Sequence, residues 1–185
     1  MFSKNDTDYY TLSHNDVNCK EYLPDDLAQF HNINNLSLFH LNCRSLKAHF
    51  DEVSDLLANT KVNFSFIGLS EVWLTNDQTD YFSLEGYNSE FCCRQNNSPY
   101  GGVALYVNKI IPYKIRNDLI LSQDLCENIW IEIPSNFFNS SLIKDNFIIG
   151  LIYRSPPTPV LLFINNLETS LNKIALDKKT FCYHW

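Results

Sequence analysis

The chain has 185 residues, of which 45% are hydrophobic and 19% are charged, so it can form one folded domain with a core and does not have a disordered composition. Its formal net charge of −7 argues against nucleic-acid binding through a broad basic surface, because phosphate contacts need Lys and Arg. This net charge does not exclude a small site built around a metal ion. No apolar run reaches the roughly 20 residues that span a bilayer, and residues 1–10 lack the apolar stretch of a signal peptide.

Cysteine spacing gives no sign of a metal or disulfide framework. Six cysteines occur at positions 19, 43, 92, 93, 126 and 182, and no two of them form a C-x-x-C pair. A zinc site or a set of disulfides is therefore disfavoured. Free thiols in a reducing intracellular compartment are the simpler interpretation.

The chain begins with a polar segment and then becomes periodic. Residues 1–35 are rich in Asn and Asp and are interpreted as a leader or linker with one short helix near 25–30. Residues 36–42 are typical of a mostly buried strand, and Ser45 is typical of a helix N-cap. Residues 64–70 predict the next strand, so strand, helix and strand fit within about 35 residues, the length of a βαβ unit. The helix has one apolar face, formed by Leu46, Phe50, Val53 and Leu57.

After residue 71 the pattern changes to several consecutive strands and then a helix. The period-two residues 128–133 and the apolar residues 146–153 are the clearest of these strands. Further strands are expected within 84–94 and over 103–107, around a turn signal at 96–102, with an extended and partly exposed stretch at 112–121, a loop at 137–144 and a strand starting at 181. The second amphipathic helix is marked by Val160, Ile164, Leu167, Leu171 and Ile174. This order predicts an α/β protein with a mixed sheet, without one helix after every strand.

Polar side chains stand at the ends of three predicted strands. Asn42 ends the first strand, Glu71 follows the second, and Tyr153 ends the strand at 146–153. Parallel neighbouring strands would place Asn42 and Glu71 at one sheet edge, where ligands of open α/β sheets gather. A cation such as Mg²⁺ prefers oxygen ligands and often needs only one or two carboxylates.

Each of these residues also has a purely structural interpretation. Asn42 suits a turn before a helix, Glu71 a solvated loop, and Tyr153 the rim of a sheet. Arg154 can add positive charge beside Tyr153 or extend into solvent. Gly101 and Gly102 indicate a hairpin turn and not a nucleotide-binding loop. The five histidines are scattered, and no Ser-His-Asp set can be assembled.

Six segments in a fixed order resemble a known family. They are Leu38-Phe-His-Leu-Asn-Cys-Arg-Ser-Leu46, Phe66-Ile-Gly-Leu-Ser-Glu-Val-Trp-Leu74, Gly86-Tyr-Asn88, Gly101-Gly-Val-Ala-Leu-Tyr-Val107, Asn128-Ile-Trp-Ile-Glu132 and Ile149-Gly-Leu-Ile-Tyr-Arg-Ser-Pro156. Together they resemble the endonuclease/exonuclease/phosphatase superfamily, whose fold is DNase I-like. The likeness is to the apurinic-type endonuclease domain of non-LTR (LINE-type) retrotransposons in particular, and it runs from residue 36 to residue 176.

The resemblance implies a fold and a chemistry. The fold is a four-layer α/β sandwich, with two sheets face to face and helices outside, and the chemistry is Mg²⁺-dependent cleavage of a phosphodiester in DNA. By the same resemblance, Asn42 and Tyr153 are catalytic residues that support the active site and contact the phosphate, and Glu71 binds the metal ion. The resemblance and the free cysteines together imply an intracellular location, with the nucleus as the candidate compartment.

The chain also departs from the family. The family requires a Gly-Asp-Phe-Asn strand and a later Ser-Asp-His element, and neither occurs in this sequence. Residues 181–185 stand where the strand leading into the first element should begin. The resemblance therefore implies that residues 36–185 are the N-terminal part of such a domain, a partial sandwich truncated before its second half.

Two consequences are expected from this departure. The chain should be a catalytically incomplete endonuclease fragment, because a lone carboxylate and a tyrosine provide no base for the attacking water. Its first sheet should lose the sheet that covers its inner face, which invites aggregation or partner binding. The alternatives are part of another phosphodiesterase or phosphatase of the superfamily, and a non-catalytic interaction module.

Overall fold

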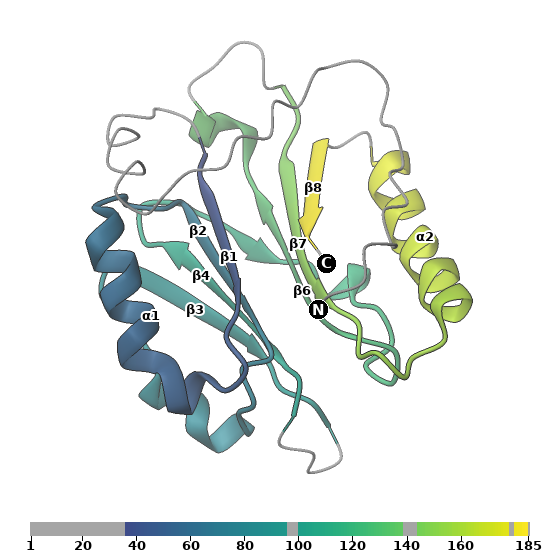
Figure 1. Ribbon diagram of the computed structural model, residues 1–185. Coiled ribbons are helices and arrows are strands. Elements are labelled where there is room, and N and C mark those ends of the chain that lie inside the picture. The colour runs from purple at the N-terminus through teal and green to yellow at the C-terminus, as the bar shows by residue number, and fades with distance from the viewer. Residues whose placement is uncertain (1–35, 96–99, 139–143, 178–179, 185) are drawn as a thin grey trace, which may run out of the picture.

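The computed structural model describes residues 36–95, 100–138, 144–177 and 180–184, the last range by its backbone. Two four-stranded sheets pack face to face, and one helix covers the outer face of each (Figure 1). The layers are helix α1 (Leu46–Thr60), the first sheet, the second sheet and helix α2 (Val160–Leu176). This is the four-layer α/β sandwich that the resemblance implied. The leader predicted for residues 1–35, with its short helix, lies outside the described residues.

The first sheet has the strand order β1-β2-β4-β3. Strands β1 (Leu38–Asn42) and β2 (Phe66–Ser70) run parallel, whereas β4 (Val103–Asn108) is antiparallel to both β2 and β3 (Tyr87–Cys92). Helix α1 connects the two parallel strands, so the predicted βαβ unit is confirmed. A 3₁₀ helix, η2 (Asn76–Tyr81), lies between β2 and β3.

The second sheet has the order β5-β6-β7-β8. Strand β6 (Glu127–Ile133) is antiparallel to β5 (Lys114–Ile115) and to β7 (Phe147–Tyr153), and β8 (Thr180–His184) pairs parallel with β7. Helix α2 connects β7 to β8 and gives a second βαβ unit. Both sheets are mixed, as predicted. Two further 3₁₀ helices are η3 (Asn117–Leu119) and η4 (Ser135–Phe138).

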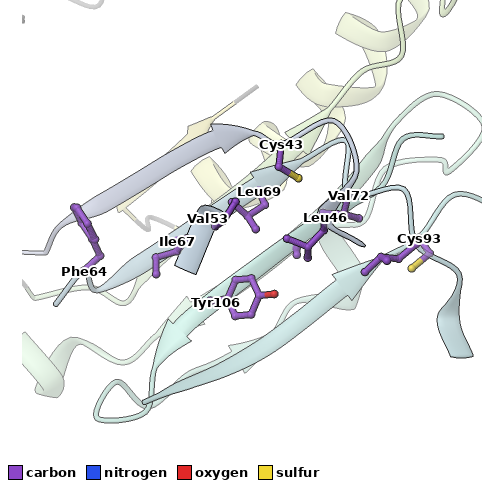
Figure 2. Packing of buried hydrophobic residues seen from close by; sticks show 11 residues of the cluster. Cys43, Leu46, Val53, Phe64, Ile67, Leu69, Val72, Cys93 and Tyr106 are labelled. Carbon is purple, nitrogen blue, oxygen red and sulfur yellow. The ribbon is translucent and has the colours of Figure 1, made fainter. Parts of the chain in front are cut away.

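Helix α1 forms where the sequence provides a cap and an apolar face. The Ser45 hydroxyl accepts a hydrogen bond from the backbone N–H of Ala48 at 3.3 Å, which confirms the predicted N-cap. Lys61 ends the helix in a left-handed conformation with a φ of 53°. Figure 2 shows the cluster between the helix and the first sheet, which includes Leu46 and Val53 from α1 and Ile67, Leu69 and Tyr106 from the sheet.

Helix α2 buries a face that differs slightly from the predicted one. Leu167 and Ile174 are buried as predicted, but Val160 is 50% exposed and Phe163 is buried in its place. The buried positions 163, 167, 170 and 174 follow the helical period, and the larger aromatic side chain fills the core at the start of the helix. Neither this helix nor α1 is long and apolar enough to span a membrane, and no other described helix is.

The segment at 112–121 is partly exposed, as predicted, but it is less extended than expected. It contains the two-residue strand β5 followed by η3, and it buries Leu119 and Leu121. The cause is the buried Arg116, whose guanidinium donates to Glu132 of β6 at 2.5 Å and draws the segment onto the second sheet. Similarly, the loop predicted at 137–144 starts inside the 3₁₀ helix η4.

The inner face of the first sheet is covered, so the expectation of an exposed sheet is wrong. Phe66, Leu105 and Val107 of the first sheet share one buried cluster with Ile131 and Leu151 of the second. Strands β5 to β8 themselves form the opposing sheet, so the chain does not need further strands to cover this face. The uncovered sheet on which the expected aggregation or partner binding relied is therefore not seen in the described residues.

The described cysteines are free thiols, as expected. Cys43, Cys92, Cys93 and Cys126 are all buried. Burial raises the pKa of the Cys43 thiol to about 11 and that of Cys126 to about 12, so both stay neutral at physiological pH. They act as small apolar core residues.

Strand β6 is buried along its whole length because it lies between two apolar layers. Ile129 and Ile131 belong to the cluster between the sheets, whereas Trp130 belongs to the cluster under α2. Trp130 lies directly opposite Gly150 of β7. A Cβ at Gly150 would stand 2.4 Å from the indole ring, so this glycine provides the space for the ring.

The substitution Gly150→Ala is expected to lower the free energy of unfolding by about 1–3 kcal/mol, because the new methyl group must displace a fully buried indole. The matched control is Gly68→Ala on β2, whose Cβ would meet the flexible end of Leu151 at 3.0 Å. Urea unfolding followed by circular dichroism should give a clearly lower midpoint for Gly150→Ala than for Gly68→Ala. Equal midpoints would contradict tight packing around Trp130.

Candidate functional site

Asn42 and Glu71 are neighbours because β1 and β2 are parallel. Asn42 is the last residue of β1 and pairs with Ser70 of β2, so Glu71 follows one residue later. Backbone pairing continues past the strands, since the N–H of Ser45 donates to the Glu71 carbonyl at 2.8 Å. Glu71 has a φ of 55°, in the left-handed region that residues other than glycine rarely adopt. The chain therefore turns at Glu71, and the turn fixes the position of its side chain.

One oxygen of the Glu71 carboxylate accepts two hydrogen bonds. Asn42 Nδ2 donates to Oε1 at 3.0 Å, and the Tyr153 hydroxyl donates to the same oxygen at 2.8 Å. Tyr153 ends β7, so this contact links the second sheet to the first. The structure thus brings together all three residues predicted from the sequence, and Asn42, Glu71 and Tyr153 are called the Glu71 site below.

The second oxygen of Glu71 has no strong partner among the described residues. Oε2 makes an ion pair of 3.9 Å with Nε of Arg44, whose side chain is 79% exposed. An exposed pair at this distance contributes little to stability. The Glu71 side chain is 19% exposed, so its carboxylate remains partly open to solvent.

The residues of the Glu71 site fit a hard divalent cation. No group of three or more His, Cys, Asp and Glu side chains converges within the described ranges, which does not suit zinc. Mg²⁺ is commonly held by one or two carboxylates and completes its shell with water and substrate phosphates. Asn42 and Tyr153 orient the carboxylate through Oε1 and leave Oε2 as the oxygen that could hold such an ion.

Tyr153 is held in its protonated form. Burial, the hydrogen bond to Glu71 and the negative charge of Glu71 together raise the pKa of its hydroxyl to about 12. The Arg94 guanidinium acts in the opposite direction and lowers this pKa. At physiological pH the hydroxyl is therefore a hydrogen-bond donor and not a base.

A charged pair that the sequence analysis missed stands next to the Glu71 site. Arg94 donates from Nε to Oε1 of Glu127 at 2.5 Å and from Nη2 to Oε2 at 3.1 Å. The Glu127 side chain is 3% exposed and that of Arg94 is 24% exposed, so the pair is largely desolvated. The sequence held one usable signal, an acidic residue directly before the period-two residues 128–133. Its partner Arg94, 33 residues earlier in the chain, carried no sequence signal of this contact.

Arg154 has a local structural role. Its Nη1 donates to the carbonyl oxygens of Ser155 and Pro156 at 3.3 Å, and to that of Thr158 at 2.8 Å. These bonds hold the turn between β7 and α2. The guanidinium therefore stabilises its own loop, which the sequence analysis did not foresee.

An open pocket of about 410 Å³ lies beside the Arg94–Glu127 pair. Three loops form it, namely the end of β3, the segment before β6 and the turn before α2. The volume is within the range of roughly 300–1,000 Å³ that is usual for ligand sites. Its polar lining includes Gln95, Gln123, Asp124, Ser155 and Thr158.

Several solved structures share the arrangement of this chain, whereas no family model matches its sequence and no curated protein is detectably similar to it. The endonuclease domain of TRAS1, a telomere-specific non-LTR retrotransposon, matches with a TM-score of 0.54 and 10% identity, over 80% of this chain and 58% of that chain. The human Nocturnin catalytic domain with bound sulfate matches with a TM-score of 0.50 and 15% identity, over 80% and 62%. The catalytic domain of Xenopus laevis APE2 matches with a TM-score of 0.45 and 16% identity, over 76% and 51%.

At these identities the likeness is one of fold. The chain spans from 51% to 62% of the length of the three structures, so it corresponds to a little more than half of each. The described part of the chain already contains both sheets and one helix on each outer face.

The substitution Glu71→Gln is expected to lower the pKa of Tyr153 from about 12 toward its ordinary value of 10, because it removes the negative charge that opposes ionisation. The pKa should stay above 10, since burial is the largest cause of the shift and is unchanged. A pH titration of ¹³C-labelled tyrosine by NMR would measure this, with the Tyr153 signal assigned by its loss in Tyr153→Phe. An unchanged pKa would contradict the contact with Glu71.

The same shift predicts a dependence of stability on pH. Because the pKa of Tyr153 is higher in the folded chain than in the unfolded one, its contribution is fully present below pH 10. It is lost as the pH rises from 10 to about 12. Tyr153→Phe should therefore reduce the loss of stability in that window.

Proposed function

We propose, from the premise that the chain has the DNase I-like fold of the endonuclease/exonuclease/phosphatase superfamily, that it is part of a Mg²⁺-dependent DNA endonuclease of the non-LTR retrotransposon kind. The observation that carries the proposal is the Glu71 site. One partly open carboxylate is oriented by an amide from its own sheet and by a hydroxyl from the opposite sheet. One carboxylate of this kind can hold Mg²⁺ when water and substrate phosphates complete the shell of the ion.

Two further observations support DNA as the substrate. One structural neighbour is the endonuclease domain of TRAS1, a telomere-specific non-LTR retrotransposon. Three of the sequence segments that resemble that family contain the residues of the Glu71 site, which lie at or directly after the ends of β1, β2 and β7. With a net charge of −7, the chain would contact DNA locally and not through a broad basic surface. An intracellular location, with the nucleus as the candidate compartment, is part of this proposal.

Each residue of the Glu71 site has a role in this proposal. Glu71 would hold Mg²⁺ through Oε2, and the bound ion would stabilise negative charge on the phosphate. Asn42 fixes the carboxylate by donating to Oε1. Tyr153 stays protonated, and when a phosphate oxygen reaches the site its one hydroxyl proton can be donated to that oxygen in place of Oε1 of Glu71.

The chain by itself should have little or no nuclease activity. Hydrolysis needs a base for the attacking water, and the 185-residue sequence contains neither Gly-Asp-Phe-Asn nor Ser-Asp-His. The other carboxylate beside Tyr153 is that of Glu127, and Arg94 occupies both of its oxygens. Glu127 is therefore not free to act as that base.

Plasmid nicking by the purified 185-residue chain in the presence of Mg²⁺ is expected to equal the background of a Glu71→Ala variant, because both lack a base. The conversion of supercoiled to open-circular DNA on agarose gels measures this. Nicking that requires Mg²⁺ and is abolished by Glu71→Ala would overturn the proposal of inactivity and would support the assignment of Glu71.

Mg²⁺ binding tests the metal site without relying on activity. Glu71→Gln should abolish binding that is seen with the unaltered chain, and Asn42→Ala should weaken it by about tenfold, the usual effect of losing a group that orients a ligand. The control is Glu85→Gln, which changes an exposed glutamate between β2 and β3 and should bind as the unaltered chain does. Calorimetric titration with MgCl₂ gives the affinities. Equal affinities for Glu71→Gln and Glu85→Gln would refute the site.

The structure affects the two alternative functions, an interaction module and another enzyme of the superfamily, in different ways. The interaction module depended on an uncovered sheet, and the cluster between the two sheets removes that basis. Another phosphodiesterase or phosphatase of the superfamily would use the same Glu71 site with a different substrate. No contact of the described residues favours it over DNA, so we do not propose it.

A further inference from the structure

We propose that Arg94 is a positioning residue for the Glu71 site: by occupying both oxygens of Glu127, it leaves Glu71 as the acceptor for the Tyr153 hydroxyl. The proposal rests on the proposed function only in taking Glu71 and Tyr153 as the pair that meets the phosphate. The contacts that support it involve neither metal nor DNA.

Two carboxylates compete for Tyr153. Its hydroxyl donates to Oε1 of Glu71 at 2.8 Å. Glu127 pairs with Tyr153 across β6 and β7, so their side chains lie on the same face of the second sheet. A tyrosine hydroxyl has one proton to donate, so at any moment only one carboxylate can receive it.

Arg94 decides this competition because its guanidinium matches the Glu127 carboxylate in a bidentate way. Nε and Nη2 each take one oxygen, at 2.5 Å and 3.1 Å. With Arg94 in place, the Glu127 side chain is only 3% exposed, so the guanidinium shields the carboxylate from water. A buried carboxylate that loses its partner needs another donor, and we expect the hydroxyl of Tyr153, the residue paired with Glu127 across the two strands, to become that donor.

Gly101 leaves the space that the guanidinium of Arg94 occupies. Its φ is 88°, and a Cβ at this position would stand 2.7 Å from Cζ of Arg94, so a side chain here would push the guanidinium away. The Gly101 carbonyl also accepts the N–H of Trp73 at 2.9 Å, two residues after Glu71. One backbone position in the β3–β4 hairpin therefore aligns Arg94 with the segment that carries Glu71.

The test follows the Tyr153 signal by NMR in chain labelled with ¹³Cζ-tyrosine, without metal or DNA, and assigned by its loss in Tyr153→Phe. Arg94→Met is expected to shift the signal, because the hydroxyl is then shared with the unpaired Glu127. The double variant Arg94→Met, Glu127→Leu is expected to return the signal to its original position, because Glu71 is again the only acceptor. If Arg94 acted only as a structural clamp, the Tyr153 signal would stay shifted in the double variant, because that variant also lacks the ion pair.

Arg94→Lys keeps the positive charge but cannot bond both oxygens of Glu127 in the same way, and it should give a smaller shift in the same direction. This variant decides the question if the double variant does not fold. No shift in either Arg94→Met or Arg94→Lys, or no return in a folded double variant, would overturn the proposal.

Mg²⁺ titration gives an independent second measurement. Arg94→Met should weaken binding by about tenfold, and the double variant should restore it, because Tyr153 again orients Glu71. If the unaltered chain binds no Mg²⁺, the proposed function fails while the NMR result still decides the role of Arg94. The two failures can therefore be told apart.

Discussion

The candidate site depends on the apolar contact between the two sheets. Tyr153 belongs to the second sheet and Glu71 to the first, so their 2.8 Å contact exists only at the spacing set by the shared cluster. Each buried Ile or Leu in that layer contributes about 1.5–3 kcal/mol, whereas a single hydrogen bond contributes about 1 kcal/mol net. Apolar packing therefore determines the distance between the two sheets, and the hydrogen bond from Tyr153 to Glu71 forms at that distance.

Strand β6 supplies two acidic residues to the second sheet, one near each end of the strand. Glu127 and Glu132 both lie on β6 and are 2% and 1% exposed. Each is matched by an arginine from outside its strand, Glu127 by Arg94 and Glu132 by Arg116. Buried ion pairs add little net stability, but removing one partner is costly, so each arginine fixes the segment that carries it.

The two pairs nevertheless serve different parts of the molecule. Arg116 also bonds Asp118 and Asp177, and it lowers the pKa of the Asp118 carboxyl to about 2, so that end of β6 is a structural network that joins η3 to the end of α2. Arg94 joins the β3–β4 hairpin to the strand opposite Tyr153. The left-handed backbone of Glu71 lies near the Glu127 end of β6. Backbone strain and charge therefore occur together at this end of the strand.

The sequence by itself predicted the local elements and the three residues of the candidate site. The N-cap at Ser45, the apolar face of α1 and the parallel pairing of β1 with β2 follow from short-range rules, and they place Asn42 beside Glu71. Period-two patterns locate strands but do not say which sheet a strand joins, so only the tertiary structure showed that β5 to β8 cover the first sheet. The Arg94–Glu127 pair likewise required the stacking of two sheets, because a contact across 33 residues leaves no periodic signal in the chain.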